Sequence, residues 1–198
     1  MSVTKRDGFI GVNKFALAEI TDTSSLTYAT PVDVPSIVGM SASRGDDSNP
    51  SYAADEVWID AKPDTGGDGS FRIRDILSDP TLRNLLAKLS GYLITAEGDL
   101  LDVGDPTPCA ILCERSAYLG KGQRKCFYWV EIGKPDFEVE TKEDNTEIGE
   151  VEYPFTFKRV QLAEGVRCST RDSFPGNSTY EGFFSEVVKT TATAANNG

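Results

Sequence analysis

Four of the six glutamates between residues 138 and 152 are the first candidates for chemistry in this chain. Glu138, Glu140, Glu150 and Glu152 fall at every second position of two short segments. Two carboxyl groups held close together can act as a general acid and a general base. Alternation at every second residue instead spreads the four along one face of a β-hairpin, with no pocket indicated by the sequence. The sequence therefore predicts a broad acidic surface and argues against an enzyme.

The segment that carries these glutamates, Lys134 to Val160, is predicted to form two alternating strands joined by a polar reversal. Apolar and aromatic residues, among them Tyr153, Phe155 and Phe157, occupy the positions between the polar ones. Period-2 alternation is typical of a strand with one buried face and one wet face. Residues 143–149 are polar and end on glycine, as expected of a long hairpin loop.

Alternation alone leaves two interpretations of the acidic face open. It is either a solvated surface that keeps the chain soluble, or a lining along which negatively charged objects slide. Like charges on one sheet face repel each other, so some compensation is expected. Arg72 and Arg74 point outward on a strand predicted for residues 70–76, and they are candidates to pair with the glutamate rows.

Composition restricts the classes of function. The chain has 198 residues, a net charge of −11 and a hydrophobic content of 39%, which supports one domain with a real core. Its negative charge disfavours non-specific adhesion to nucleic acid or to an anionic membrane. No apolar run follows the start MSVTKRDG, and nothing approaches the ~18 apolar residues of a membrane span. A soluble protein made in a cytoplasm is expected.

The sequence gives little support for metal binding or for nucleophilic catalysis. The chain has no histidine, which removes the usual general base and the commonest zinc ligand. Its four cysteines do not show the C-x-x-C spacing of zinc or redox motifs. We expect reduced core thiols, and neither a cofactor nor a metal. The four are Cys109, Cys113, Cys126 and Cys168.

A long polar excursion, Arg44 to Glu56, interrupts the β pattern. Its Arg-Gly-Asp triplet is interpreted as a chance match to adhesion motifs, and the spacing of its acidic residues is not that of a calcium loop. Loops of this length are uncommon unless they are functional. We predict a loop that reaches a neighbouring subunit. The residues assigned to that contact are Asp46, Asp47, Asn49 and Tyr52.

One helix is predicted, from Pro80 to Ser90. Asp79 suits the N-cap, proline suits the first helical position, and Gly91 suits the position after the C-cap. Leucines at helical spacing give this helix one apolar stripe, which is expected to pack on a sheet. These leucines are Leu82, Leu85, Leu86 and Leu89.

The other predicted elements are strands. Residues 57–62 and 70–76 are expected to pair with each other through the turn PDTGGDG, and residues 126–132 are expected to be the central strand. Phe183, Phe184, Val187 and Val188 are predicted to anchor a C-terminal arm. We divide the chain into a domain of residues 1–180 and an arm and disordered tail of residues 181–198. The remaining strands are predicted at residues 8–20, 34–43, 92–101, 109–119 and 165–172.

Three stretches of the chain resemble the major tail protein, or tail tube protein, of tailed bacteriophages with long flexible non-contractile tails. They read DDSNPSYAADEVWIDA, GGDGSFRIRDI and CFYWVEIGKPDFEVETKEDNTEIGEVEYPFTFKR. The resemblance covers residues 8–171. It implies a mainly β fold, with a β-sandwich or barrel-like core, one flanking helix, and long hairpins that join into a β-barrel on oligomerisation.

The resemblance also implies a function. Such subunits form stacked hexameric rings whose lumen conducts double-stranded DNA into the host without binding it specifically. The implied partners are further copies of the chain, a tape measure protein, and tail terminator and distal tail proteins, with no membrane and no small-molecule substrate. The implied location is the virion tail, assembled in the host cytoplasm. Under this interpretation the lumen-facing residues are Glu138, Glu140, Glu150, Glu152, Arg72 and Arg74.

Two other functions remain open at this point. A monomeric β-sandwich could bind a ligand such as a carbohydrate, with Trp58 and Trp129 as stacking platforms. Trp129 lies within the most apolar predicted strand, however, so its ring is expected in the core. A tube subunit of a related bacterial secretion or injection machine is the other alternative.

Overall fold

The computed structural model describes residues 9–45, 49–53, 56–61, 66–74, 79–117, 120–136, 149–163 and 166–189. Within these residues the chain is mainly β, with one helix and one large antiparallel sheet in the order β2-β1-β10-β11-β12-β7-β4. Strand β3 pairs with β1, and β15 pairs with β11. The elements are β1 (Phe9–Asp22), β2 (Thr27–Tyr28), β3 (Val32–Asp33), β4 (Ile37–Arg44), β5 (Asn49–Ala53), β6 (Glu56–Ala61), β7 (Gly67–Arg74), α1 (Pro80–Leu89), β8 (Tyr92–Ile94), β9 (Leu100–Asp102), β10 (Cys109–Ala117), β11 (Gln123–Ile132), β12 (Glu150–Phe157), β13 (Val160–Ala163), β14 (Val166–Cys168) and β15 (Thr170–Ser173).

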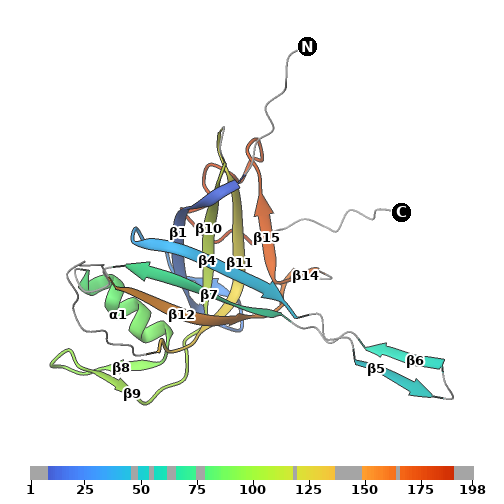
Figure 1. Ribbon diagram of the computed structural model, residues 1–198, viewed down its shortest axis with the longest axis horizontal. Helices are drawn as coiled ribbons and strands as arrows, with labels where there is room; N and C mark the ends of the chain where they lie inside the picture. The colour runs from blue at the N-terminus through green and yellow to red at the C-terminus, as the bar shows by residue number, and fades with distance from the viewer. Residues whose placement is uncertain are drawn as a thin grey trace, which may run out of the picture.

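The large sheet folds over itself into two layers that cross each other (Figure 1). Strands β1, β10, β11 and β15 form one layer, and β4, β7 and β12 form the other. The layers join where the end of β11, Val130–Ile132, pairs with Phe155–Phe157 of β12. Crossed layers of this kind enclose the side chains of their two inner faces, which become the core.

The first core cluster fills the space between the two layers. Phe15 from β1 and Phe127 from β11 meet Phe71 from β7 and the aromatic side of β12. The ring centroids of Phe71 and Tyr153 are 5.4 Å apart and nearly parallel, and those of Phe15 and Phe71 are 5.1 Å apart. The alternation predicted for residues 150–157 is confirmed, because Tyr153, Phe155 and Phe157 are buried while the residues between them are exposed.

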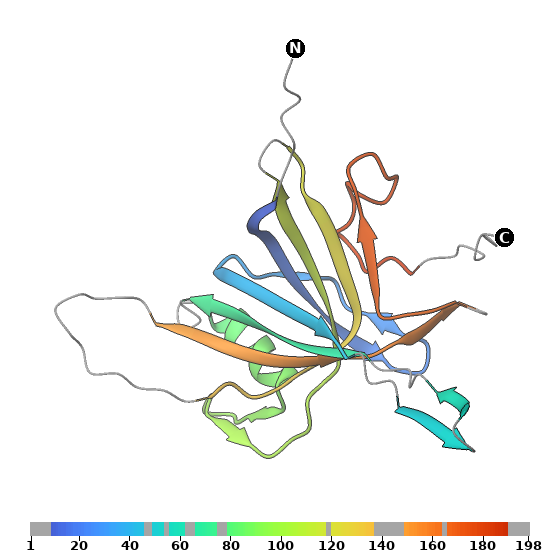
Figure 2. The ribbon, with the colours of Figure 1, turned by 45° about the vertical axis from the view of Figure 1, so that its right-hand side comes forward.

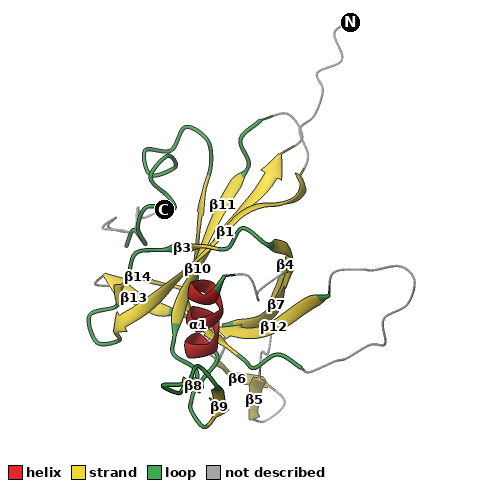
Figure 3. Cartoon of the chain, turned by 90° about the vertical axis from the view of Figure 1, so that its left-hand side faces the viewer, coloured by secondary structure: helices red, strands yellow, loops and turns green. Residues whose placement is uncertain are grey.

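Helix α1 closes one end of this core, as predicted (Figure 3). The Asp79 carboxylate accepts hydrogen bonds from the backbone N–H groups of Thr81 and Leu82, at 2.9 and 3.1 Å. Gly91 follows the C-cap with a φ of +83°, a conformation that glycine adopts without steric cost. The buried leucines of the helix are Leu82, Leu86 and Leu89.

A second core cluster lies on the opposite face of β1, β10 and β11. On that face β1 and β10 contribute small alanine side chains, and Leu112, Cys126 and Tyr128 complete the cluster. Residues 180–188 cross it, with Phe183 fully buried and Phe184 and Val187 packed at its margin. The prediction that this segment is anchored by Phe183 is confirmed. Residues 190–198 lie outside the described part of the chain.

The cysteines lie in or next to these two clusters. Cys109 and Cys126 are buried, and Cys113 and Cys168 are partly buried, with all four present as free thiols. Burial raises the pKa of the Cys126 thiol to about 12. At neutral pH this thiol therefore behaves as a small apolar side chain.

Two predictions about residues 44–76 are wrong. Residues 49–53, expected in a loop, form strand β5, which pairs with β6 in a hairpin that projects from the body (Figure 2). The expected pairing of residues 57–62 with residues 70–76 does not occur either, because β7 pairs with β4 and β12. Two of the three glycines interpreted as a turn, Gly67 and Gly69, belong to β7. A Cβ atom on Gly69 would lie 2.3 Å from the Ser41 carbonyl oxygen and 2.6 Å from the Phe155 ring, so the strand requires glycine there.

Smaller differences concern strand limits. The strand predicted at residues 34–43 corresponds to β4, which begins at Ile37. The strand predicted at residues 165–172 is split into β14 and β15. Strand β11 is central as predicted, since it pairs with β10, β12 and β15. The first strand of the predicted acidic hairpin falls largely on residues 137–148, which lie outside the described residues.

Candidate functional site: the outer face of strands β4, β7 and β12

The strand register brings polar residues from β4, β7 and β12 onto one outer face. Glu150 lies opposite Arg74, and Glu152 lies opposite Arg72. Directly opposed residues of an antiparallel pair project to the same side of a sheet, so these four share the face that points away from the core. The remaining members of this outer face are Gly39, Ser41, Ser43, Asp68, Ser70, Pro154 and Thr156.

The two arginines bind one carboxylate. Arg72 Nη1 lies 3.0 Å from Glu150 Oε2, and Arg74 Nη2 and Nε lie 2.6 and 3.0 Å from Glu150 Oε1. The predicted pairing of these arginines with a glutamate row is therefore confirmed for Glu150. Both arginine side chains are about half exposed, so this cluster contributes little to stability. It sets the local charge, and the described part of the face carries carboxylates and guanidinium groups together.

Small residues occupy the middle of the outer face. Ser41 and Ser70 lie opposite each other with their hydroxyl oxygens 3.4 Å apart, and Gly39 carries no side chain beside Arg72. Only short side chains occupy these central positions. The centre of the outer face therefore carries small polar residues.

Strand β4 forms the edge of this layer. It pairs with β7 from Ile37 to Arg44, and among the described residues no strand pairs with its other side. An edge strand of this length exposes a row of backbone N–H and C=O groups that another strand can bind. The layer is therefore open to extension at β4.

The other predicted site residues fall in or beside the undescribed segments. Glu138, Glu140, Asp46 and Asp47 lie outside the described residues. The contact residues Asn49 and Tyr52 belong to β5, where their backbones pair with Ala61 and Val57. Their assignment to a subunit contact stays a prediction.

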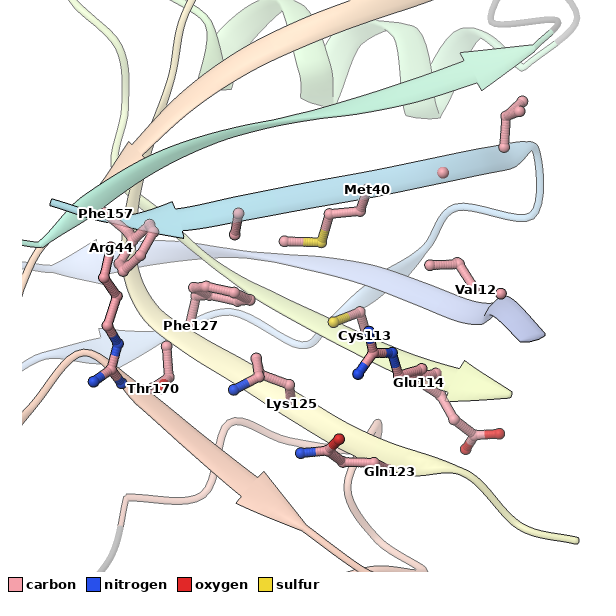
Figure 4. A pocket seen from close by; sticks show the side chains of 15 residues that line it. Val12, Met40, Arg44, Cys113, Glu114, Gln123, Lys125, Phe127, Phe157 and Thr170 are labelled. Carbon is pink, nitrogen blue, oxygen red and sulfur yellow. Dashed lines mark hydrogen bonds between the residues drawn. The ribbon is translucent and has the colours of Figure 1, made fainter. Parts of the chain in front are cut away.

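A groove lies between β4 and the strands of the other layer, and sequence reasoning missed it (Figure 4). Its volume is about 480 Å³, and its apolar walls include Met40, Cys113 and Phe127. Lys125 and Arg44 lie along it, together with Arg115 and Glu114. The lining residues are scattered from residue 11 to residue 170, so no local pattern in the sequence could have indicated the groove.

Trp129 is not a core residue, which corrects the sequence prediction. Its ring is half-buried, and Lys158 Nζ lies 4.2 Å from the ring centroid. The indole N–H donates a 2.9 Å hydrogen bond to Glu131 and holds the pKa of that carboxyl below its ordinary value. A lysine over the ring leaves less of it for stacking on a sugar, which weakens the case for a carbohydrate platform at Trp129.

A buried ion pair that sequence reasoning also missed fixes the C-terminal segment. Arg124 Nε lies 2.6 Å from Glu114 Oε2, and Asn13 Nδ2 donates to Glu114 Oε1 at 2.8 Å. The same guanidinium lies 3.8 Å from the Tyr180 ring centroid and donates to the Tyr180 carbonyl oxygen. These contacts connect the end of the chain to β10 and β11, and they serve the fold rather than an open site.

Comparisons with known proteins point to no other functional site. No family model matches the chain, and no curated protein matches it either. The described residues contain no group of three or more cysteine or acidic side chains placed to hold a metal ion. None of the helical structure described here is long and apolar enough to cross a membrane.

Proposed function

We propose that this protein is a structural subunit of a tube, of the tail tube class found in bacteriophages with long flexible tails. Copies of the chain associate into hexameric rings, the rings stack, and the outer face of β4, β7 and β12 lines the bore. The observation that carries the proposal is the architecture of this layer. One of its faces is aromatic and buried, the other is polar, and the layer ends in β4, whose outer edge pairs with no strand among the described residues.

The open edge favours assembly over a monomeric role. A long unprotected edge strand is an aggregation hazard, and closed barrels remove that hazard because every strand gains a neighbour on both sides. A ring of subunits joined edge to edge would have the same effect at β4. The outer face would then become the inner surface of a continuous barrel, without any change in the aromatic core behind it.

The chemistry of the face suits the passage of double-stranded DNA. Its described carboxylates are Asp68, Glu150 and Glu152, and its two described arginines, Arg72 and Arg74, both bind Glu150. The described face therefore carries a net charge of −1. Proteins hold DNA chiefly through lysine and arginine contacts to phosphates, which release counterions. A bore in which arginines are already engaged by carboxylate would let the phosphates slide past. Further copies of the chain, a tape measure protein, and terminator and distal tail proteins would be its partners in the virion.

Electron microscopy of the purified protein tests this proposal directly. At high protein concentration we expect rings or tubes with a central channel, which negative staining resolves. Particles that stay monomeric at every concentration up to the solubility limit would contradict the proposal. A tube subunit of a secretion or injection machine would share this architecture, and DNA passage through assembled particles would separate the two functions.

A further inference from the structure

The hairpin formed by β8 and β9 exposes an unusual number of apolar side chains. The described chain has six exposed large hydrophobic residues, and four of them lie between residues 93 and 103. Leu93 is 55% exposed and Val103 is 68% exposed, and Leu101 pairs with Leu93 across the hairpin. The fourth is Leu100. Such a cluster on a protein surface typically marks an interaction site.

The β8–β9 hairpin is also acidic and firmly attached to the body. Residues 92–105 contain Glu97, Asp99, Asp102 and Asp105 but no lysine or arginine, which gives this stretch a charge of −4. The Gly104 N–H donates a 3.1 Å hydrogen bond to the Gly91 carbonyl oxygen, and Lys134 forms an ion pair with Asp102. The hairpin therefore projects as a positioned apolar knob with an acidic border.

The groove beside β4 has the complementary properties. Its walls are apolar, and its charged lining includes Arg44, Arg115 and Lys125. Lys125 is paired with Asp172 at 2.7 Å, and the Glu114 carboxylate is paired with Arg124. Together these four cations and two carboxylates give a local charge of +2, on a chain whose net charge is −11. An acidic apolar knob and a basic apolar groove on the same chain match in charge, which favours their contact and fixes its orientation.

The two surfaces lie on opposite sides of the β4–β7–β12 layer. The β8–β9 hairpin lies on the β12 side of the layer in Figure 1, whereas the groove is lined by Met40, Ala42 and Arg44 of β4. Within one chain they cannot meet. A hairpin that occupies the groove would therefore come from a second copy of the chain.

We propose that the β8–β9 hairpin of one copy docks into the groove beside β4 of the next copy. This inference rests on the proposed tube function and names the contact that joins neighbouring subunits within a ring. The contact is head-to-tail, because each copy contributes one hairpin and one groove that differ from each other. Head-to-tail contacts close into rings or continue as filaments, whereas self-complementary contacts stop at a dimer.

Two variants test the contact from its two sides. A hairpin variant carries Leu93→Ser and Leu101→Ser, which alter exposed side chains and should leave the fold intact. A groove variant carries Arg44→Glu and Arg115→Glu, which leave the Lys125–Asp172 ion pair in place. Loss of buried leucine contacts or reversal of matched charges should weaken association about tenfold or more. Sedimentation velocity should show the wild type as oligomers, and each variant alone as a monomer at the same concentration.

Mixing the two variants gives the sharpest result. The hairpin variant retains a sound groove and the groove variant retains a sound hairpin, so a mixture can form one contact and no second one. We expect a heterodimer of twice 21.5 kDa that does not grow further. Phe174→Ser is the matched control, because Phe174 is half exposed but lies outside both surfaces, and this variant should assemble as the wild type does.

The outcomes separate this inference from the proposed function. Rings or tubes that persist in both variants would overturn the inference and leave the tube function standing. The wild type could instead form oligomers that the variants abolish but that show no channel in electron micrographs. That result would support the contact and contradict the tube function. Assembly blocked by the groove variant alone would show that another segment occupies the groove, and a mixture that stays monomeric would also overturn the proposal. A wild-type chain that stays monomeric overturns both.

Discussion

The two layers of the sheet differ in how they are covered. Strands β1, β10 and β11 are packed on both faces, by the first core cluster on one side and by residues 180–188 on the other. Strands β4, β7 and β12 are packed on one face only. The sequences reflect this difference, because β10 begins with the continuous apolar run CAILC while β12 alternates at every second residue. The doubly covered layer supplies stability, and the singly covered layer leaves a face for function.

The ion pairs of the two layers differ in the same way. Glu114 and Arg124 join the doubly covered layer to the C-terminal segment, and their side chains are only 9% and 14% exposed. Glu150 and its two arginines lie on the open face of the other layer, with the arginines half exposed. Similar charges should therefore have very different effects when removed, and substitutions can measure that difference.

Uncovering the second face of β1, β10 and β11 should have the largest effect. Phe183→Ala removes a fully buried ring from the second core cluster, and truncation of a buried phenylalanine costs about 3 to 5 kcal/mol. Chemical denaturation should show a free energy of unfolding that is lower by that amount. Phe174→Ala is the control, since this half-exposed ring should change the free energy of unfolding by less than about 0.5 kcal/mol. Equal losses in both variants would mean that residues 180–188 do not cover the sheet.

Breaking the buried ion pair should have the next largest effect. Glu114→Ala leaves Arg124 buried without its carboxylate, at a cost of about 3 kcal/mol, and thermal unfolding should report it. Glu150→Ala removes a carboxylate that also binds arginine, yet it should cost less than about 1 kcal/mol because those guanidinium groups remain hydrated. Similar costs for the two substitutions would contradict the distinction between the layers.

Glycines of the open layer provide a comparison at a smaller scale. Gly69→Ala would place a methyl group against the Ser41 carbonyl oxygen and the Phe155 ring, and overpacking of this kind costs about 1 to 3 kcal/mol. Gly39→Ala lies on the outer face, where the nearest atom to the new methyl group is Arg72 Nη2 at 3.6 Å, an ordinary contact. Denaturation curves should show a clear loss for the first variant and little change for the second. A loss of equal size at residue 39 would place that residue against packed atoms.

Local signals in the sequence were sufficient for the elements that local chemistry determines. Asp79 and Gly91 bound the helix because a cap and a left-handed residue act within one turn of the chain. Alternation in β12 was readable because one face of that strand is buried and the other is wet. The pairing of Arg72 and Arg74 with Glu150 followed from the same alternation in β7.

The features that were missed depend on contacts between distant residues. Gly67 and Gly69 look like turn residues, but their role is to let Phe155 and Phe157 pack against β7, which only the sheet order reveals. The groove is lined by residues from several strands. Leu101 is exposed because no other part of the described chain covers it. Neither is encoded in a local pattern of residue types.

The smallest effect on stability is expected at Glu152, where the effect on function should be largest. Glu152→Lys changes an exposed residue of the outer face opposite Arg72, so repulsion should cost only a few tenths of a kcal/mol and thermal unfolding should hardly change. If this face lines a DNA channel, each added lysine can bind a phosphate and release counterions, which slows passage. Ejection of DNA from particles built with this variant should be slower than from the wild type at low salt, and the difference should shrink as salt rises. Lys121→Glu, which changes a lysine paired with Glu181 away from this face, is the control and should leave the ejection rate unchanged. An ejection rate that Glu152→Lys leaves unchanged at every ionic strength would place this face outside the bore. The comparison of the two layers would survive that result, because it rests on packing, but the open layer would then need another partner.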